Sequence, residues 1–175
     1  MANFFQKIDG IEIIKFISPH PKDFTDDVIQ AIKDCDKVSR ILHLPLQSGS
    51  TEVLRKMNRK YTKEEYKSII DKIRRIRPDI SITTDVIVGF PNETEKDFEE
   101  SMETIKDINF SKVHVFPYSK RNGTKAARMT NHVDGNTKKE RREVRKMNEE
   151  ELMRMKKIEK REKVDIALAY MLIVI

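Results

Sequence analysis

The stretch TTDVIVGFPNETEKDFEES, residues 83 to 101, decides the fold class of this 175-residue chain. An apolar run meets a Gly-Phe-Pro turn, and an acidic helix start follows at once. A strand that delivers the chain through such a turn into a helix is how many α/β enzymes build a ligand site at the carboxyl ends of their strands. We therefore expect a strand, a ligand-facing turn and a helix here.

Strands and helices alternate on both sides of this stretch. Apolar runs predict strands at residues 11–18, 40–47, 81–90 and 112–119. Helical spacing and capping residues predict helices at 25–34, 50–57, 62–77 and 94–108, and a charged helix at about 136–163. Thr62 and Glu65 match the capping-box pattern. Strands that alternate with helices indicate parallel pairing through right-handed crossovers.

Four strands make an incomplete structure of this class. A parallel sheet needs both faces covered, and a barrel needs closure. We therefore expect residues 1–135 to form an α/β fold with parallel strands, a partial (β/α) TIM-like barrel that is part of a larger domain. Residues 136–175 are expected to form a long charged helix and an atypical tail, VDIALAYMLIVI.

Composition limits the classes of function. The net charge of +6 is compatible with nucleic-acid contact and equally with a merely soluble surface. A single cysteine, Cys35, cannot form an internal disulfide, which favours a reducing compartment. Nor can one thiol hold a structural zinc or an iron–sulfur cluster. No stretch resembles a signal peptide or a spanning helix, so we expect a cytoplasmic protein with no membrane partner.

Each expected strand ends in polar or conformationally special residues. These are Ser18-Pro19-His20-Pro21, Gln47-Ser48-Gly49-Ser50, Gly89-Phe90-Pro91-Asn92-Glu93 and Pro117-Tyr118-Ser119. Because the carboxyl ends of parallel strands converge on one face, the four clusters are expected to ring one pocket. The alternative is ordinary turn chemistry, since Gly, Pro, Ser and Asn occupy turns everywhere.

Asp85 lies inside the third expected strand, on the same face as Thr83 and Ile87. A carboxylate in a buried strand is costly without a partner. Two interpretations stay open: a structural Asp that is hydrogen-bonded, or an Asp that faces a ligand. The last helix is equally open. It carries a small basic surplus and a narrow apolar stripe, so it is either a solvated helix packed along one edge or an RNA-facing surface.

Three segments resemble, in order and spacing, the radical S-adenosylmethionine tRNA methylthiotransferases: HLPLQSGSTEVLRKMNRKYTKEEY, TTDVIVGFPNETEKDFEES and FPYSKRNGTKAARM. SPHPKDFTDDVIQAI fits the same family just upstream, and the resemblance covers residues 11–145. It implies the carboxyl-side part of the radical SAM barrel. The family's enzymes add a methylthio group at C2 of a modified adenosine next to the tRNA anticodon.

The resemblance implies cofactor-binding roles for residues at the strand ends. Gln47, Ser48 and Gly49 would approach the ribose and amino-acid part of S-adenosylmethionine. Asp85, Val88, Gly89 and Pro91 would border the adenine, and Tyr118 and Ser119 would close the adenosyl pocket. Arg121, Gly123 and Thr124 match a loop on the RNA side. No catalytic or metal-ligating residue is assigned.

The departures from the family concern its radical chemistry. The CxxxCxxC loop, three further cysteines and the carboxyl-terminal tRNA-binding β-barrel have no counterpart here. Asn92 stands where the family usually has glycine, a tolerable exchange if the turn needs a positive φ. Alone, the chain is expected to be a fragment that binds no cluster and has no activity. Expected partners are tRNA and a separate cysteine-rich amino-terminal half.

Two questions stay open at this stage. SPHPKDF and HLPLQSGS resemble the branch that acts on isopentenyladenosine, whereas HVFPYSKRNGTKAARM is closer to the branch that acts on threonylcarbamoyladenosine. We favour the first. The alternative function is a non-catalytic RNA-binding remnant that uses the basic carboxyl-terminal helix.

Overall fold

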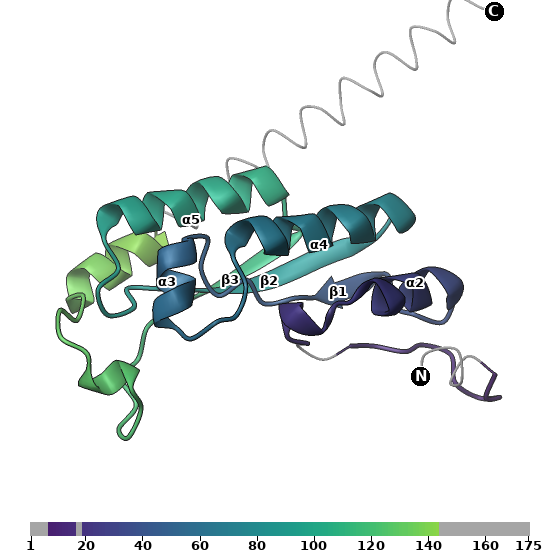
Figure 1. Ribbon diagram of the computed structural model, residues 1–175, viewed down its shortest axis with the longest axis horizontal. Coiled ribbons are helices and arrows are strands. Elements are labelled where there is room, and N and C mark those ends of the chain that lie inside the picture. Colours follow the sequence, from purple (N-terminus) through teal and green to yellow (C-terminus); the bar gives the residue numbers. More distant parts are fainter. Residues whose placement is uncertain (1–6, 17–18, 144–175) are drawn as a thin grey trace, which may run out of the picture.

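The computed structural model describes residues 7–16 and 19–143, and its centre is a three-stranded parallel sheet of order β1-β2-β3 (Figure 1). The strands are β1 (Ile41–His43), β2 (Ser81–Val88) and β3 (Lys112–Pro117). In the register, Leu42 lies opposite Ile82, and Asp85 lies opposite His114. The expected α/β class with parallel strands is confirmed.

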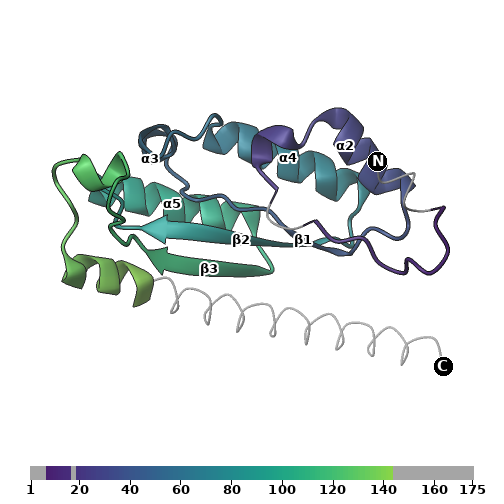
Figure 2. The same ribbon diagram turned by 90° about the horizontal axis from the view of Figure 1, so that it is seen from below.

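The helices lie mainly on one side of this sheet. They are α2 (Asp26–Asp34), α3 (Thr51–Lys56), α4 (Lys63–Ile76) and α5 (Glu95–Ile108), with short 3-10 helices at Pro21–Asp23 and Ala126–Arg128. Figure 2 shows α2, α4 and α5 in one layer above the strands. A further helix over residues 135–143 lies near the carboxyl end of β3 (Figure 2). Among the described residues, none of the helices is long and apolar enough to cross a membrane.

The alternation of β2 separates a buried face from an open one. Ile82, Thr84 and Val86 are at most 1% exposed and join the core beneath the helices. Thr83, Asp85 and Ile87 lie half-buried on the opposite face, as the alternation predicted. On this open face Ile41 is 63% exposed and Phe116 is 51% exposed. The sheet therefore has one face covered by helices and one face that the described residues leave largely uncovered.

Capping residues set the helix boundaries that the sequence predicted. Thr62 accepts a hydrogen bond from the Glu65 amide at 3.1 Å, and the Glu65 carboxylate accepts one from the Thr62 amide at 2.8 Å. Thr94 and Asp97 form a second reciprocal capping box at the start of α5. Asn109 then ends α5 in a left-handed conformation with φ 54°.

The strand expected at residues 11–18 is wrong. Over the part of this segment that the structure describes, Ile14 alone pairs, through a parallel bridge to Val38. Its amide donates to the Lys37 carbonyl at 2.8 Å, and its carbonyl accepts from the Ser39 amide at 2.9 Å. The β-branched composition favours a strand, but a strand persists only where a neighbouring backbone supplies its hydrogen bonds. The described sheet thus has three strands rather than the four expected.

The strand expected at residues 40–47 is interrupted. Regular pairing with β2 covers Ile41–His43 and ends before Pro45. Pairing resumes at Gln47, whose amide donates to the Asp85 carbonyl at 2.8 Å and whose own φ is 70°. Smaller differences affect the third and fourth expected strands, which end at Val88 and Pro117. For the predicted helix at 136–163, the part beyond residue 143 lies outside the described residues.

Replacing Gly49 with alanine should destabilise the fold. A Cβ at this position would lie 2.6 Å from the Ser101 Cα and 2.7 Å from the Thr104 Cβ, because the chain passes directly against α5. We expect Gly49→Ala to lower the free energy of unfolding by about 1–3 kcal/mol through overpacking. Urea unfolding measures this change.

The matched control is Gly135→Ala, where an added Cβ meets no atom within 4 Å. Gly135 lies at the start of the last described helix, so alanine there should leave the stability unchanged or raise it slightly. Equal losses in the two variants would contradict the role of Gly49 in packing against α5.

Candidate functional site

A cavity of about 520 Å³ lies at the carboxyl-terminal part of the sheet, on its open face. It is lined by Gln47, Asp85, Ile87, Phe116, Pro117, Tyr118, Ser119, Arg121, Thr124 and Ala126. Residues from the end of the interrupted first strand, from β2, from β3 and from the following loop therefore meet at one place. Six residues assigned through the family resemblance line this cavity: Gln47, Asp85, Tyr118, Ser119, Arg121 and Thr124.

Asp85 is hydrogen-bonded, which agrees with the first of the two interpretations left open by the sequence, and it also lines the cavity. Its Oδ2 lies 3.3 Å from the Nε2 of His43, and its side chain remains 28% exposed. The Nδ1 of the same imidazole lies 3.0 Å from the Thr83 hydroxyl. The His43 ring thus orients the Asp85 carboxylate while one side of that carboxylate stays available to the cavity.

His43 and His114 belong to the surroundings of this carboxylate, and sequence reasoning treated them as scattered. Their ring centroids lie 6.3 Å apart, and His114 stacks on Phe116 at 6.4 Å. The parallel register could have revealed them, because it sets His43 beside Thr83 and His114 beside Asp85. Across residues 7–16 and 19–143, no group of three or more His, Cys, Asp or Glu side chains is arranged to hold a metal ion.

Tyr118 forms a wall of the cavity and is held on several sides. Its amide donates to the Val88 carbonyl at 2.8 Å. Its ring meets Phe90 edge-on at 5.2 Å, stacks on His132 at 6.1 Å, and lies 5.4 Å from the Lys138 ammonium. The hydroxyl is buried and has no hydrogen-bond partner in the described protein.

The turn after β2 supports the cavity without lining it. Gly89 has φ 71°, and its amide donates to both oxygens of Glu93 at 3.0 and 3.1 Å. The Phe90 amide donates to the same carboxylate at 3.3 Å. Asn92 adopts φ 62°, which confirms that this position needs the left-handed conformation. Burial raises the pKa of Glu93, although the Gly89 amide and Arg141 both act to lower it.

The remaining predicted cofactor residues lie outside the cavity lining. Ser48 is 1% exposed and contacts the Ser101 hydroxyl at 3.2 Å, and the Gly49 amide donates to the same hydroxyl at 3.0 Å. The close backbone approach at Gly49 is therefore to α5. Of the residues assigned through the family resemblance, Ser48, Gly49, Val88, Gly89, Pro91 and Gly123 do not line the cavity.

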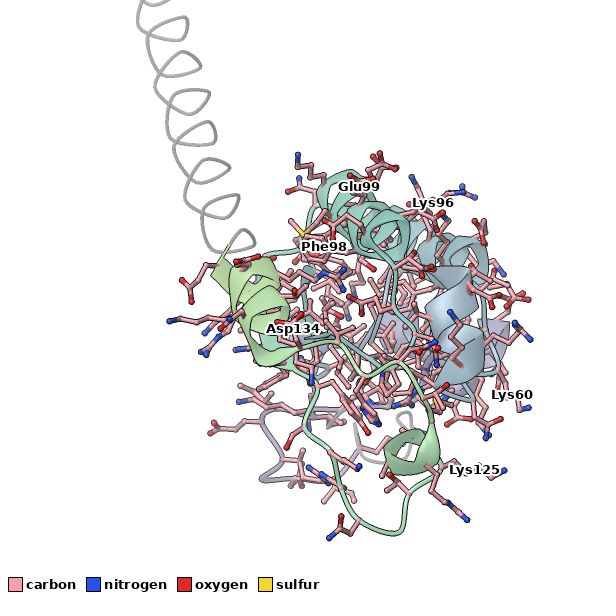
Figure 3. The ribbon with its side chains drawn as sticks, turned by 90° about the vertical axis from the view of Figure 1, so that its left-hand side faces the viewer. Lys60, Lys96, Phe98, Glu99, Lys125 and Asp134 are labelled. Atoms are coloured by element: carbon pink, nitrogen blue, oxygen red, sulfur yellow. The ribbon has the colours of Figure 1, made fainter. Side chains whose placement is uncertain are left out.

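A basic loop follows β3 and borders the cavity through Arg121 and Thr124. Residues 119–133 contain no Asp or Glu, and their four basic side chains, Lys120, Arg121, Lys125 and Arg128, are exposed. Figure 3 shows Lys125 on the outer side of this loop, away from the helical layer. The loop therefore presents uncompensated positive charge beside the cavity mouth.

Comparison with known proteins now decides the family. The pattern that defines the Radical SAM superfamily matches residues 3–105. The chain belongs to this superfamily. A radical SAM structure, coproporphyrinogen III oxidase from Escherichia coli, matches with a TM-score of 0.62 at 20% identity, over 75% of this chain and 30% of that one. This likeness confirms the radical SAM type of fold for the three parallel strands.

The curated relatives are tRNA-2-methylthio-N(6)-dimethylallyladenosine synthases. The protein from Thermoanaerobacter pseudethanolicus is 56% identical over 136 residues, 78% of this chain and 29% of its own length. Those from Caldicellulosiruptor saccharolyticus and Fusobacterium nucleatum are 52% and 50% identical over 77% of this chain. The resemblance to tRNA methylthiotransferases is confirmed. This radical SAM chain spans only about 30% of the length of the relatives it matches.

The residues of this radical SAM chain do not fit an iron–sulfur cluster. Its one cysteine, Cys35, is 0% exposed within the hydrophobic core. A cluster needs several thiolate or imidazole ligands at one place. The cavity does have features suited to an adenosyl cofactor, since the polar side chains of Gln47 and Asp85 stand among apolar side chains such as Ile87 and Phe116.

Protonation of Asp97 should loosen the loop that delivers Gln47 to the cavity. The Asp97 carboxylate accepts from the Ser50 hydroxyl at 2.6 Å and from the Thr94 amide at 2.9 Å. Burial acts to raise its pKa, but these hydrogen bonds outweigh burial and lower the pKa from its ordinary value. The folded state therefore gains stability from the ionised form above the pKa of the unfolded chain, and the gain is lost as the pH falls through the lowered pKa of the folded state.

We expect Asp97→Asn to reduce the free energy of unfolding at pH 7 by about 1.5–3 kcal/mol, the range for a hydrogen bond to a charged group. The difference from the unsubstituted protein should shrink as the pH falls below 4, and urea unfolding across this range measures it. Asp71→Asn, on the exposed surface of α4, is the control. A difference that does not change with pH would contradict the role of the Asp97 charge.

Proposed function

We propose that this chain supplies the S-adenosylmethionine-facing part of a radical SAM tRNA methylthiotransferase. The observation that carries the proposal is the meeting of Gln47, Asp85 and Tyr118 in one cavity on the open face of the sheet. The volume of about 520 Å³ lies within the range of about 300–1,000 Å³ typical of small-molecule sites. A cofactor with an adenosine and an amino-acid group fits this size and this mixture of surfaces.

The residues divide into a lining set and a supporting set. In the lining set, the Asp85 carboxylate would accept hydrogen bonds from ribose hydroxyls, and Gln47 and Ser119 would bond polar groups of the cofactor. Ile87 and Phe116 would contact the adenine. In the supporting set, Ser48, Gly49, Val88, Gly89 and Pro91 hold the turns in place. The residues we infer to bind the cofactor directly are thus fewer than the family resemblance implies.

The whole enzyme would add a methylthio group at C2 of a dimethylallyl-modified adenosine, as the names of the relatives indicate. The electron that starts radical chemistry comes from an iron–sulfur cluster, and this chain has no ligand set for one. We infer that a cysteine-rich half, which would complete the barrel on the open face, supplies the cluster in the cytoplasm. The residues present here would bind and orient the cofactor.

A second function is favoured by the basic loop. Four exposed cationic side chains without an acidic neighbour in residues 119–133 suit the phosphates of tRNA. The loop borders the cofactor cavity, so an RNA held there would lie beside the reaction site. The basic helix proposed as an RNA-binding surface lies mostly outside the described residues, and this loop is the better-placed candidate.

Asp85→Asn should weaken binding of S-adenosylmethionine. The amide keeps the shape of the carboxylate but removes the charge that accepts hydrogen bonds from two hydroxyls, so we expect the affinity to fall about tenfold or more. Titration calorimetry on the full chain measures it. Asp36→Asn is the matched control, because Asp36 is exposed and lies before β1, at the opposite end of the sheet.

Equal affinities of the two variants for S-adenosylmethionine would contradict the proposed role of Asp85 in binding the cofactor. A folded chain that shows no binding at all would contradict the proposal that these three strands form a cofactor-binding part without the other half of the barrel.

Neutralising the basic loop should weaken tRNA binding in a salt-dependent manner. If Lys125 and Arg128 each contact a phosphate, the double variant Lys125→Gln/Arg128→Gln should reduce the slope of log affinity against log salt by about 1.4–1.8. Filter binding at several salt concentrations measures this slope. Lys33→Gln/Lys106→Gln, with the same charge change on α2 and α5, should leave it unchanged. An equal effect of both pairs would indicate non-specific charge attraction.

A further inference from the structure

The chain after β3 returns to the turn between β2 and α5 and contacts it repeatedly. We call residues 130–141 the clasp and residues 89–93 the turn. Figure 3 shows Phe98 between α5 and the helix that contains the end of the clasp. Neither the sequence motifs nor the family resemblance assigned a role to this contact, which joins segments about 40 residues apart along the chain, for example Asn92 with Asn131.

The strongest contact is a buried ion pair. Arg141 donates from Nη1 to the Oε1 of Glu93 at 2.6 Å and from Nη2 to the Oε2 of Glu95 at 2.9 Å. The side chains of Arg141 and Glu93 are only 7% and 3% exposed. The guanidinium also lies 5.2 Å from the centre of the Phe98 ring. This degree of burial distinguishes the pair from a surface salt bridge, because removal of one partner would leave the other charge without compensation.

Glu93 carries the effect of Arg141 into the turn. The carboxylate that meets Arg141 also accepts the hydrogen bonds of the Gly89 and Phe90 amides. Phe90 in turn packs against the ring of Tyr118, which lines the cavity. A continuous series of contacts therefore leads from Arg141 through Glu93 and Phe90 to the cavity wall.

Two further contacts attach the clasp to the same turn. The Asn92 amide donates to the Asn131 carbonyl at 3.0 Å, and the Asn131 side-chain amide donates to the Asn92 Oδ1 at 3.0 Å. The Asn92 side chain also donates to the Thr130 carbonyl at 3.2 Å. On the other side of the turn, the Lys138 stem fills the space beside Gly89, where a Cβ would lie 2.3 Å from its Cγ.

We propose that Arg141 is a positioning residue of the cavity: through Glu93 it fixes the turn, and the turn and clasp together fix Tyr118. The inference rests on the proposed function for the identity of the ligand, but the geometry of the turn can be tested without one. Because burial raises the pKa of Glu93, loss of the guanidinium favours proton uptake by the carboxylate, which weakens its bonds to the two amides. Tyr118 is then no longer held in position at the cavity wall.

Amide hydrogen exchange on the full chain tests this role. In Arg141→Gln, exchange of the Gly89, Phe90 and Tyr118 amides should become about a hundredfold faster, which corresponds to loss of one partner of a buried ion pair. Exchange of Ile82 and Val86 in the middle of β2 should not change. Arg142→Gln is the matched control, since it removes the same charge from the exposed neighbouring position.

Unchanged exchange of the turn in Arg141→Gln, or an equal acceleration throughout β2, would overturn the proposal. If Arg141→Gln does not fold, Asn92→Gly provides the second test. Glycine keeps the left-handed backbone and the main-chain bond to the Asn131 carbonyl, but it loses the two side-chain bonds to Thr130 and Asn131. Its turn amides should exchange about tenfold or more faster, as expected for the loss of two hydrogen bonds. A turn that keeps its protection in this variant would also overturn the proposal.

Cofactor binding separates this inference from the proposed function. With S-adenosylmethionine as the probe, Arg141→Gln should lower the affinity about tenfold or more, while Arg142→Gln should not change it. Wild-type affinity in Arg141→Gln, alongside a loosened turn, would overturn the positioning role at the cofactor site. If the unsubstituted chain binds no S-adenosylmethionine, the proposed function fails, and the exchange result alone decides whether Arg141 fixes the turn.

Discussion

The cavity depends most on the two hydrogen bonds that the Thr84 hydroxyl makes to the chain around Pro45. The hydroxyl donates to the Leu44 carbonyl at 2.8 Å and accepts from the Leu46 amide at 2.7 Å, on either side of Pro45. The regular backbone pairing with β2 stops at this point, and the Thr84 side chain supplies hydrogen bonds to the Leu44 carbonyl and the Leu46 amide in its place. The chain continues beside β2 across this break with its register shifted by one residue, since His43 lies opposite Thr83 whereas Gln47 lies opposite Val86. Without this repair the first wall of the cavity would be separated from the second.

Helix starts and the orientation of β2 could be predicted because they depend on local chemistry. Thr62 and Thr94 cap their helices through residues three positions away, and alternation placed Asp85 on the same face as Thr83 and Ile87. The strand predicted at residues 11–18 was wrong, because the formation of a strand depends on a partner backbone that the local sequence does not specify. The sequence did not predict that Ser48 and Gly49 pack against α5, for a similar reason. Their contacts are with a residue about 50 positions further along the chain.

The candidate site shows how a family motif combines residues that line the cavity with residues that hold the backbone. Gln47 and Ser48 are neighbours in the same motif, yet one lines the cavity and the other is 1% exposed against α5. The left-handed φ of 70° at Gln47 turns the chain between these two environments. Membership in the family motif therefore does not distinguish the two kinds of residue, whereas the structure separates the residue that lines the cavity from the one that packs against α5.

Asn92 affects the unfolded chain as well as the turn. Its left-handed backbone would suit glycine, but glycine would give the unfolded chain more conformations to lose on folding. Asparagine tolerates the same φ with little strain and leaves less conformational entropy to be lost. The turn after β2 is thereby favoured by the residue itself before any distant part of the chain reaches it. The stability of the turn thus depends on the limited conformational freedom of Asn92 in the unfolded chain as well as on the contacts of the folded state.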